Sequence, residues 1–230
     1  MFINKRVMAG KLHEDAVQHA PASNGNIRFS FSIRQSRPIK LASGKTGIAT
    51  EYARCTLWVS GSNHAFHADK LKSGAWVIVE GRHNVTKKQK GEEVVTYHDI
   101  DVAEIQYPPR GKVPPYINRH TVVGNLGRDA KFFPSNTTDR VKIVFSTATT
   151  RYRRNGDGQS SEETTWLDHV LWVVASAEDR YRKMLTQGAM VWIEGRHDVT
   201  KREVSGETKY YPEILVREVK LFTPEDQSSN

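Results

Sequence analysis

The sequence predicts an all-β protein with one short helix in each of two similar domains, and three observations support this prediction. The stretch WVIVEGRHNVTKK at 76–88 returns as MVWIEGRHDVTKR at 190–202, so one long segment is written twice. Most of the periodic segments alternate with period two, as half-buried strands do. Clusters of Gly, Ser and Asn separate these segments, and turns favour those residues.

The repeat covers almost the whole chain at a constant spacing of 114 positions. Adding 114 to the residue number relates Gly10 to Gly124 and Trp58 to Trp172, and no gap is needed between them. A period of this length is too long for a solenoid unit and is about the size of a small domain. A chain of 230 residues also suits two domains. The spacing therefore predicts a duplicated domain.

A proline-rich segment marks the boundary between the two copies. Four prolines lie within 107–117, and they disfavour both helix formation and strand pairing, so this segment is expected to be a short, stiff connector. We expect an N-terminal domain at 1–107, a linker at 108–116, a C-terminal domain at 117–222 and a short tail at 223–230.

Each domain is predicted to contain five strands and one helix. In the C-terminal half, strands are expected near 119–125, 141–149, 165–174, 189–201 and 210–222. The segment 176–188 breaks the period-two pattern. It opens with a Ser-x-x-Asp cap and closes on glycine, which predicts a short helix. The first half repeats this order, with its helix at 62–74. Five strands with one helix between the third and fourth is the element order of an OB-fold, a small five-stranded Greek-key barrel, and the chain is predicted to hold two in tandem.

The third strand of each half has two faces of different character. In the C-terminal half, one face holds Leu167, His169, Leu171 and Val173, and the other holds Trp166, Asp168, Val170 and Trp172. In the N-terminal half, Ala53, Cys55, Leu57 and Val59 stand against Tyr52, Arg54, Thr56 and Trp58. The aliphatic face is expected to be the barrel core, with His169 and Cys55 in structural roles.

The aromatic residues on the opposite face are candidates for contacts with nucleic-acid bases. A packed core would not leave two rings per domain beside polar residues unless something covers them. Bases of a single strand stack on such rings, whereas duplex bases are already stacked. The alternative is that Trp58 and Trp172 fill an interface between barrels or subunits. For Trp76 and Trp192, on the fourth strand, core or subunit packing is favoured.

The repeated EGRH segment is expected to lie near the end of the fourth strand. There Gly81 and Gly195 permit a bend before a long hairpin that carries basic side chains. His83 and His197 recur at the same place in both copies. A base contact and a packing role are both open for these histidines, and packing is favoured.

The charge of the chain favours a polyanionic partner, most commonly nucleic acid. The formal net charge is +8, from 34 Lys plus Arg against 26 Asp plus Glu. A merely solvated basic surface is the alternative. Basic residues gather in loop-like stretches at 34–47 and 150–158 and not on an amphipathic helix, so no membrane partner is expected. No apolar run approaches the roughly 20 residues of a membrane span, and no signal-peptide core is present, so a cytoplasmic protein is expected.

An enzymatic function has little support in the sequence. The motif Gly44-Lys45-Thr46 lacks the earlier glycine of a phosphate-binding P-loop, because Ile39 stands at that place. The single cysteine, Cys55, permits neither an internal disulfide nor a cysteine-based metal cage. We therefore predict no catalytic residues, no metal site and no cofactor.

Several segments, in order along the chain, carry a resemblance to a known family. In the C-terminal half they are NRHTVVGNLGRD at 118–129, FSTAT at 145–149, TW at 165–166 and VWIEGR at 191–196. These segments resemble the bacterial single-stranded DNA-binding protein (SSB) family, and the N-terminal half is a weaker copy that keeps Tyr52, Trp58 and the EGR of 80–82. The resemblance implies OB-folds that wrap single-stranded DNA during replication, repair and recombination. Since the family uses four folds per assembly, it also implies a homodimer.

Three departures from the family pattern shape the expected site. A cationic stretch at 151–154 follows the second strand where a tryptophan is usual, and Lys88 and Arg202 replace an aromatic residue at the end of the fourth strand. More cations and fewer rings are expected to make binding depend steeply on salt. The tail LFTPEDQSSN lacks an acidic tip, so recruitment of repair enzymes through it is not expected. The residues predicted to bind DNA are Tyr52, Trp58, Tyr152, Trp166, Trp172, Arg34, Arg37, Arg82, Lys87, Lys88, Arg151, Arg153, Arg154, Arg196, Lys201 and Arg202.

Two other functions remain open at this point. An OB-fold also serves as a protein-interaction adaptor, here in a replication-restart or mobile-element complex, although the duplicated aromatic residues argue against it. A single-stranded RNA target is the second, because stacking and phosphate contacts do not distinguish the sugar.

Overall fold

Two compact units make up the chain in the computed structural model, which describes residues 2–40, 43–91, 93–154, 160–204 and 206–222. One unit is Lys5–Asn118, and the other is Arg119–Asn230 together with Met1–Asn4. Each unit is built around a closed barrel of five long strands.

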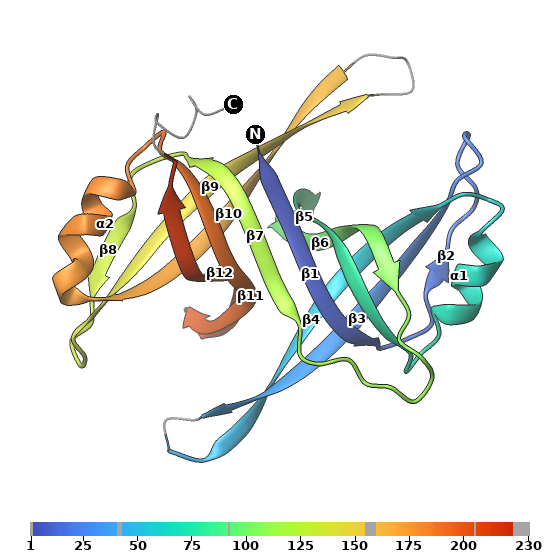
Figure 1. Ribbon diagram of the computed structural model, residues 1–230, viewed down its shortest axis with the longest axis horizontal. Helices are drawn as coiled ribbons and strands as arrows, with labels where there is room; N and C mark the ends of the chain where they lie inside the picture. Colours follow the sequence, from blue (N-terminus) through green and yellow to red (C-terminus); the bar gives the residue numbers. More distant parts are fainter. Residues whose placement is uncertain (1, 41–42, 92, 155–159, 205, 223–230) are drawn as a thin grey trace. The chain divides into compact units, whose positions relative to one another are not determined.

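The N-terminal barrel closes because each of its long strands pairs with two others. These strands are β1 (Ile3–Leu12), β3 (Ile27–Lys40), β4 (Thr46–Val59), β5 (Trp76–Lys90) and β6 (Glu93–Gln106). β1 pairs with β3 and β5, β3 with β4, and β5 with β6, all antiparallel, and the parallel pairing of β4 with β6 completes the ring. A short strand, β2 (Val17–Gln18), pairs with β3, and the helix α1 (His64–Lys70) follows β4 (Figure 1).

The C-terminal barrel repeats this arrangement strand for strand. Its long strands are β7 (Asn118–Leu126), β9 (Arg140–Arg154), β10 (Ser160–Val174), β11 (Met190–Val204) and β12 (Glu207–Leu221). The parallel pairing of β10 with β12 closes the ring, as that of β4 with β6 does in the first barrel. The short strand β8 (Lys131–Pro134) pairs with β9, and a 3-10 turn, η1 (Ala175–Ala177), leads into α2 (Glu178–Met184).

The predicted OB-fold order of five strands, with a helix between the third and fourth, is confirmed in both barrels. The strands β9 and β10 run past their predicted ends at 149 and 165, because their outer halves pair with each other as a hairpin. The strands β2 and β8 were not predicted, since two to four residues are too few to show a period.

The predicted Ser-x-x-Asp cap of the second helix is wrong. Ser176 lies in the 3-10 turn η1, the N-cap of α2 is Ala177, and no side chain caps that position. Acidic residues in the first turn and basic residues in the last turn favour the helix dipole instead. Neither this helix nor any other in the described residues is long and apolar enough to cross a membrane.

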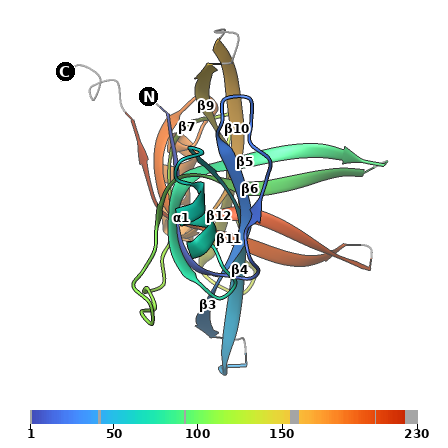
Figure 2. The same cartoon turned by 90° about the vertical axis from the view of Figure 1, so that its right-hand side faces the viewer.

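A β-bulge follows the repeated glutamate in each barrel, at the glycine that was expected to permit a bend. The pairing register shifts between Glu80 and Gly81 on β5, and between Glu194 and Gly195 on β11. A Cβ added at Gly81 would lie 2.0 Å from the carbonyl oxygen of Asp101, so only glycine allows this approach. Beyond the bulge, β5 and β6 continue as a long hairpin that projects from its own barrel, green in Figure 2.

The core contains the aliphatic faces of the third strands, as predicted. Its β4 and β10 members are Ala53, Cys55, Leu57, Val59, Leu167, His169, Leu171 and Val173, all buried. Burial lowers the pKa of His169 to about 3, and this ring stacks on Phe145 and shares a hydrogen bond of 2.8 Å with Thr147. Burial also raises the pKa of the Cys55 thiol to about 12. Both residues are therefore uncharged packing groups near neutral pH.

Candidate nucleic-acid interface

The outer face of the third strand exposes two aromatic rings in each barrel. On β4, Tyr52 is 55% and Trp58 is 49% exposed, and on β10 the values are 52% for Trp166 and 43% for Trp172. The strand alternation places these rings opposite the core, because the residues that alternate with them, such as Cys55 and Leu167, are buried. Large rings left half in water form a surface that a ligand can cover.

Val170 departs from the open face on which the sequence placed it. It is only 2% exposed, although it lies between Trp166 and Trp172 on the same side of β10. Val144 stands opposite it on β9, and Leu215 stands beside it on β12. These cross-strand aliphatic neighbours share its face and account for its burial.

Trp166 and Tyr52 occupy equivalent positions in the two barrels, but different residues lie against their rings. The Trp166 ring lies over Gly127, where an added Cβ would be 2.4 Å from Cζ3 of the ring. In the other barrel the residue at the place of Gly127 is His13, and its ring meets Tyr52 edge-on, with centroids 6.2 Å apart and an interplanar angle of 85°. The residue at this repeat position therefore determines how the ring at 52 or 166 lies.

Cations beside the second ring of each pair were missed in the sequence analysis. Arg28 stands directly opposite Trp58 on β3, with its guanidinium carbon 5.9 Å from the ring centroid. Lys142 stands opposite Trp172 on β9. Directly opposite residues of an antiparallel pair share a face, so each cation lies beside a stacking ring. The 114-residue spacing relates Arg28 to Lys142, and this repeated charge could have identified both.

A third ring in each barrel was also missed. Tyr97 on β6 and Tyr211 on β12 are repeat equivalents, and Tyr211 is 38% exposed. The Arg54 guanidinium carbon lies 4.5 Å from the Tyr97 centroid, and the Lys88 ammonium lies 5.9 Å from it. Cations at these distances interact favourably with the ring face. Tyr97 therefore brings Lys88, a predicted phosphate contact, close to the outer face of the barrel.

Three of the predicted arginines are engaged with carboxylates. The pairs are Arg37 Nε with Glu51 Oε1 at 3.2 Å, Arg151 Nη2 with Glu163 Oε2 at 2.7 Å, and Arg196 Nη2 with Asp198 Oδ2 at 3.2 Å. Glu51 is buried and also accepts hydrogen bonds from Tyr116 and Asn118. A phosphate would have to compete with these carboxylates for the arginines.

The other predicted side chains differ in accessibility. Arg34, Lys87, Lys88 and Tyr152 are exposed, and Arg82 is half-buried. Arg34 stands opposite Tyr52 on β3, so a cation and a ring share one face there. The side chains of Arg153, Arg154, Lys201 and Arg202 lie outside the described residues, and their roles stay predictions.

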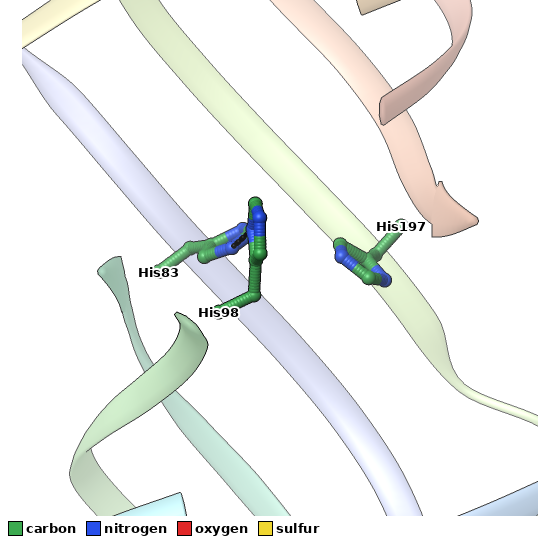
Figure 3. Close-up of side chains that lie close together, drawn as sticks. All are labelled: His83, His98 and His197. Atoms are coloured by element: carbon green, nitrogen blue, oxygen red, sulfur yellow. Dashed lines mark hydrogen bonds between the residues drawn. The ribbon is translucent and has the colours of Figure 1, made fainter. Parts of the chain in front are cut away.

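Burial favours packing roles for the repeated histidines. His83 is 2% and His197 is 4% exposed. His83 on β5 shares a hydrogen bond with His98 on β6, 3.1 Å from Nε2 to Nδ1, which Figure 3 draws as a dashed line. Trp76 and Trp192 are half-buried, and the ammonium of Lys220 lies 5.3 Å from the Trp192 ring centroid. The packing role of the two tryptophans stays a prediction.

Comparisons with known proteins agree with the repeat and with the fold. The model of the single-strand binding protein family matches residues 3–107 and again residues 117–222. The chain is similar to the wild-type single-stranded DNA binding protein from Thermus aquaticus, with 17% identity and a TM-score of 0.70 over 96% of this chain and 94% of that one. A deletion mutant of the same protein gives 17% identity and a TM-score of 0.71 over 97% and 98%. At this identity, the structural likeness shows the shared fold.

Proposed function

The chain belongs to the single-strand binding protein family, and we propose that it binds single-stranded DNA by stacking bases on the outer face of each OB-fold. The observation that carries this proposal is the pair of half-exposed rings on β4 and again on β10, Tyr52 with Trp58 and Trp166 with Trp172. One stacked base contributes about 1–3 kcal/mol, and because every base has a flat face, such binding depends little on sequence. Duplex DNA offers these rings no unstacked base.

Cations around the rings would hold the phosphates of the bound strand. Arg28 and Lys142, which adjoin the tryptophans, join the predicted set: Arg34, Arg37, Arg82, Lys87, Lys88, Arg151, Arg153, Arg154, Arg196, Lys201 and Arg202, with Tyr152 as a further ring. The exposed members are expected to contribute most, since the ion-paired arginines must first leave a carboxylate.

The repeat also suggests how the protein assembles and where it acts. With two OB-folds per chain, a homodimer would present four, and we propose this assembly in DNA replication, repair and recombination at the cytoplasmic nucleoid. The domains would lie at 1–107 and 117–222, with 108–116 as the linker. We propose no catalytic role, because the family's function is binding. A particle mass in solution of about twice 26.1 kDa would support the dimer, and a monomeric mass would contradict it.

A protein-interaction adaptor is not favoured as the function. The family match covers both repeats, and the outer faces carry rings and cations where an adaptor that had lost nucleic-acid binding would not need them. Competition by single-stranded RNA would show whether the sugar is distinguished, since stacking alone does not read a 2′-hydroxyl.

The direct test is a titration of the intrinsic tryptophan fluorescence with oligothymidylate at several salt concentrations. The wild type would be compared with Trp166→Ala and Trp172→Ala, and duplex DNA would serve as competitor. Trp192→Phe is the matched control, because Trp192 is a half-buried β11 residue whose ring packs beside Lys220. We expect strong quenching that duplex does not abolish, and weaker binding by the two alanine variants alone. A protein that neither quenches nor binds oligothymidylate at low salt would overturn the proposal.

A further inference from the structure

The N-terminal barrel has a polar pocket between its two outer-face rings. The pocket has a volume of about 370 Å³, within the range of ligand sites, and Arg54 and Thr56 of β4 border it. Tyr52 and Trp58 lie on the same face of β4, on either side of these two residues. The two rings are separated by about 20 Å along the strand, at roughly 3.3 Å per residue. A strand that stacks on both rings would place an intervening base over the pocket.

The charges of the pocket suit the edge of a neutral base better than a phosphate. Nε and Nη2 of Arg54 lie 2.7 and 2.6 Å from one oxygen of Asp99, Oδ1. Within the described residues, the other oxygen, Oδ2, accepts no hydrogen bond and is available to a ligand donor. Glu14 and Asp15 also border the pocket, and although Lys72 pairs with Asp15 at 3.4 Å, the three carboxylates still outnumber the two cations and disfavour a phosphate.

A chain of hydrogen bonds orients one further donor toward the pocket. Nη2 of Arg28 lies 3.1 Å from Nδ1 of His19, and because a guanidinium can only donate, Nδ1 is the acceptor. The ring proton of His19 is therefore on Nε2, which lies 2.9 Å from Oγ of Ser30 and donates to it. The hydroxyl hydrogen of Ser30, a residue that borders the pocket, is left to donate to a ligand.

These donors and acceptors match the edges of guanine. Its O6 and N7 are acceptors that a guanidinium or hydroxyl reads, and its N1–H and 2-amino group are donors that a carboxylate accepts. We propose that the pocket binds a guanine base, with Arg54 and Ser30 donating to the O6 and N7 side and Asp99 Oδ2 accepting from N1–H. Thymine also presents an N–H beside a carbonyl oxygen, but it has no acceptor corresponding to N7 and carries a methyl group on that side, so one of the two donors would be left without a partner. This inference rests on the proposed single-strand binding and adds a base preference to it.

The C-terminal barrel lacks this combination of residues. At the repeat equivalents of Arg54, Thr56 and Ser30 it has Asp168, Val170 and Val144. Ser146 donates to Asp168 at 2.5 Å, and Val170 is buried. The guanine preference is therefore a property of the N-terminal barrel, while both barrels keep their stacking rings.

The test is a competition assay on the full chain. A labelled oligothymidylate is displaced by unlabelled oligomers of the same length that carry one central guanine, inosine, 7-deazaguanine or adenine, or thymine throughout. We expect the guanine oligomer to compete about tenfold better than the all-thymine one, since a good pair of base-edge contacts discriminates by about 5-fold to 150-fold. The inosine oligomer lacks only the 2-amino group, so it should still compete better than the all-thymine oligomer. The 7-deazaguanine oligomer lacks the N7 acceptor, so it should compete less well than the guanine oligomer.

Variants assign the preference to the pocket. On the Asp99→Asn and Arg54→Gln variants, the guanine and thymine oligomers are expected to compete equally well. Both variants should still bind oligothymidylate. Glu213→Gln, at the repeat equivalent of Asp99 in the other barrel, should keep the tenfold preference. Equal competition by guanine and thymine against the wild type would overturn this inference and leave single-strand binding intact. No binding of oligothymidylate at all would overturn the proposed function, and this inference with it.

Discussion

The Trp166 ring rests on a glycine, so its contribution to binding can be tested without removing the ring. A Cβ at Gly127 would lie 2.4 Å from Cζ3 and 2.6 Å from Cη2 of Trp166. Carbon atoms in contact stay about 3.5 Å apart, so in Gly127→Ala the ring must move by about 1 Å or turn away. The fold is expected to tolerate this change, because the clash involves the far end of an exposed side chain and no backbone atom.

The expected loss follows from the free energy of stacking one base. Trp166→Ala removes the whole contact, about 1–3 kcal/mol, and should raise the Kd for oligothymidylate about 5-fold to 150-fold. Gly127→Ala only displaces the ring and should cost about 1 kcal/mol, or about fivefold. Fluorescence anisotropy with a labelled oligothymidylate at constant salt would measure both values, and thermal unfolding would check that each variant is folded.

The double variant decides whether Gly127 acts through Trp166. If it does, Gly127→Ala adds no loss once Trp166 is alanine, and the double variant binds as Trp166→Ala does. Losses that simply add would mean that Gly127 affects DNA binding by another route. A Trp166→Ala protein that binds as tightly as the wild type would refute the stacking role itself.

Three further predictions concern the hairpin, the core and the bulge. Replacing both Lys87 and Lys88 by glutamine should reduce the magnitude of the salt slope of log K by about 1.4, since each phosphate neutralised on a single strand contributes about 0.7; titrations at several salt concentrations measure this slope. His169 has a pKa of about 3 in the fold against about 6.5 when unfolded, so between these values the unfolded state binds more protons. The stability of the C-terminal barrel is therefore complete above about pH 6.5 and falls toward pH 3, by up to about 1.4 kcal/mol per pH unit, as urea unfolding at several pH values would show. Gly81→Ala should destabilise the N-terminal barrel by about 3 kcal/mol, because its Cβ would lie 2.0 Å from the Asp101 carbonyl oxygen, and thermal unfolding would register the loss.

Each of these predictions has an outcome that contradicts it. An unchanged salt slope in the lysine variant would show that Lys87 and Lys88 do not contact phosphates. His169→Cys places in this core the residue that the other barrel has at the same repeat position, Cys55, and should flatten the acid limb of the stability curve. If the stability of this variant falls as steeply with pH as that of the wild type, groups other than His169 cause the pH dependence. A Gly81→Ala protein as stable as the wild type would show that the bulge adapts to a side chain.

The barrels could be predicted because two kinds of sequence signal agreed. The period-two alternation marked the strands, and the 114-residue repeat supplied a second copy of each. The helix cap at Ser176 was mispredicted because its motif describes only local backbone preferences, and the 3-10 turn η1 incorporates this serine before the helix begins. The strands β2 and β8 form by pairing with β3 and β9 and carry no periodic signal of their own.

The stacking faces were predictable for the same reason, whereas the state of the arginines was not. Alternation along β4 and β10 determines which side a ring lies on. Whether Arg37 is free or bound to Glu51 depends on the register between β3 and β4, which brings residues 14 positions apart together. The burial of Val170 depends likewise on Leu215, which comes from a parallel strand far along the chain.

The hairpin beyond the bulge has a consequence for molecules that are crowded together. In the described part of β5 after Gly81, the pairing is with β6 alone, so one backbone edge of that strand has no partner strand there. Open edges invite strands of other molecules, and lysine side chains are a common defence against such pairing. Lys87 and Lys88 are exposed on this edge strand. Copies that coat a DNA strand side by side would meet at high local concentration, so these lysines would also protect the protein from aggregation where it is most crowded.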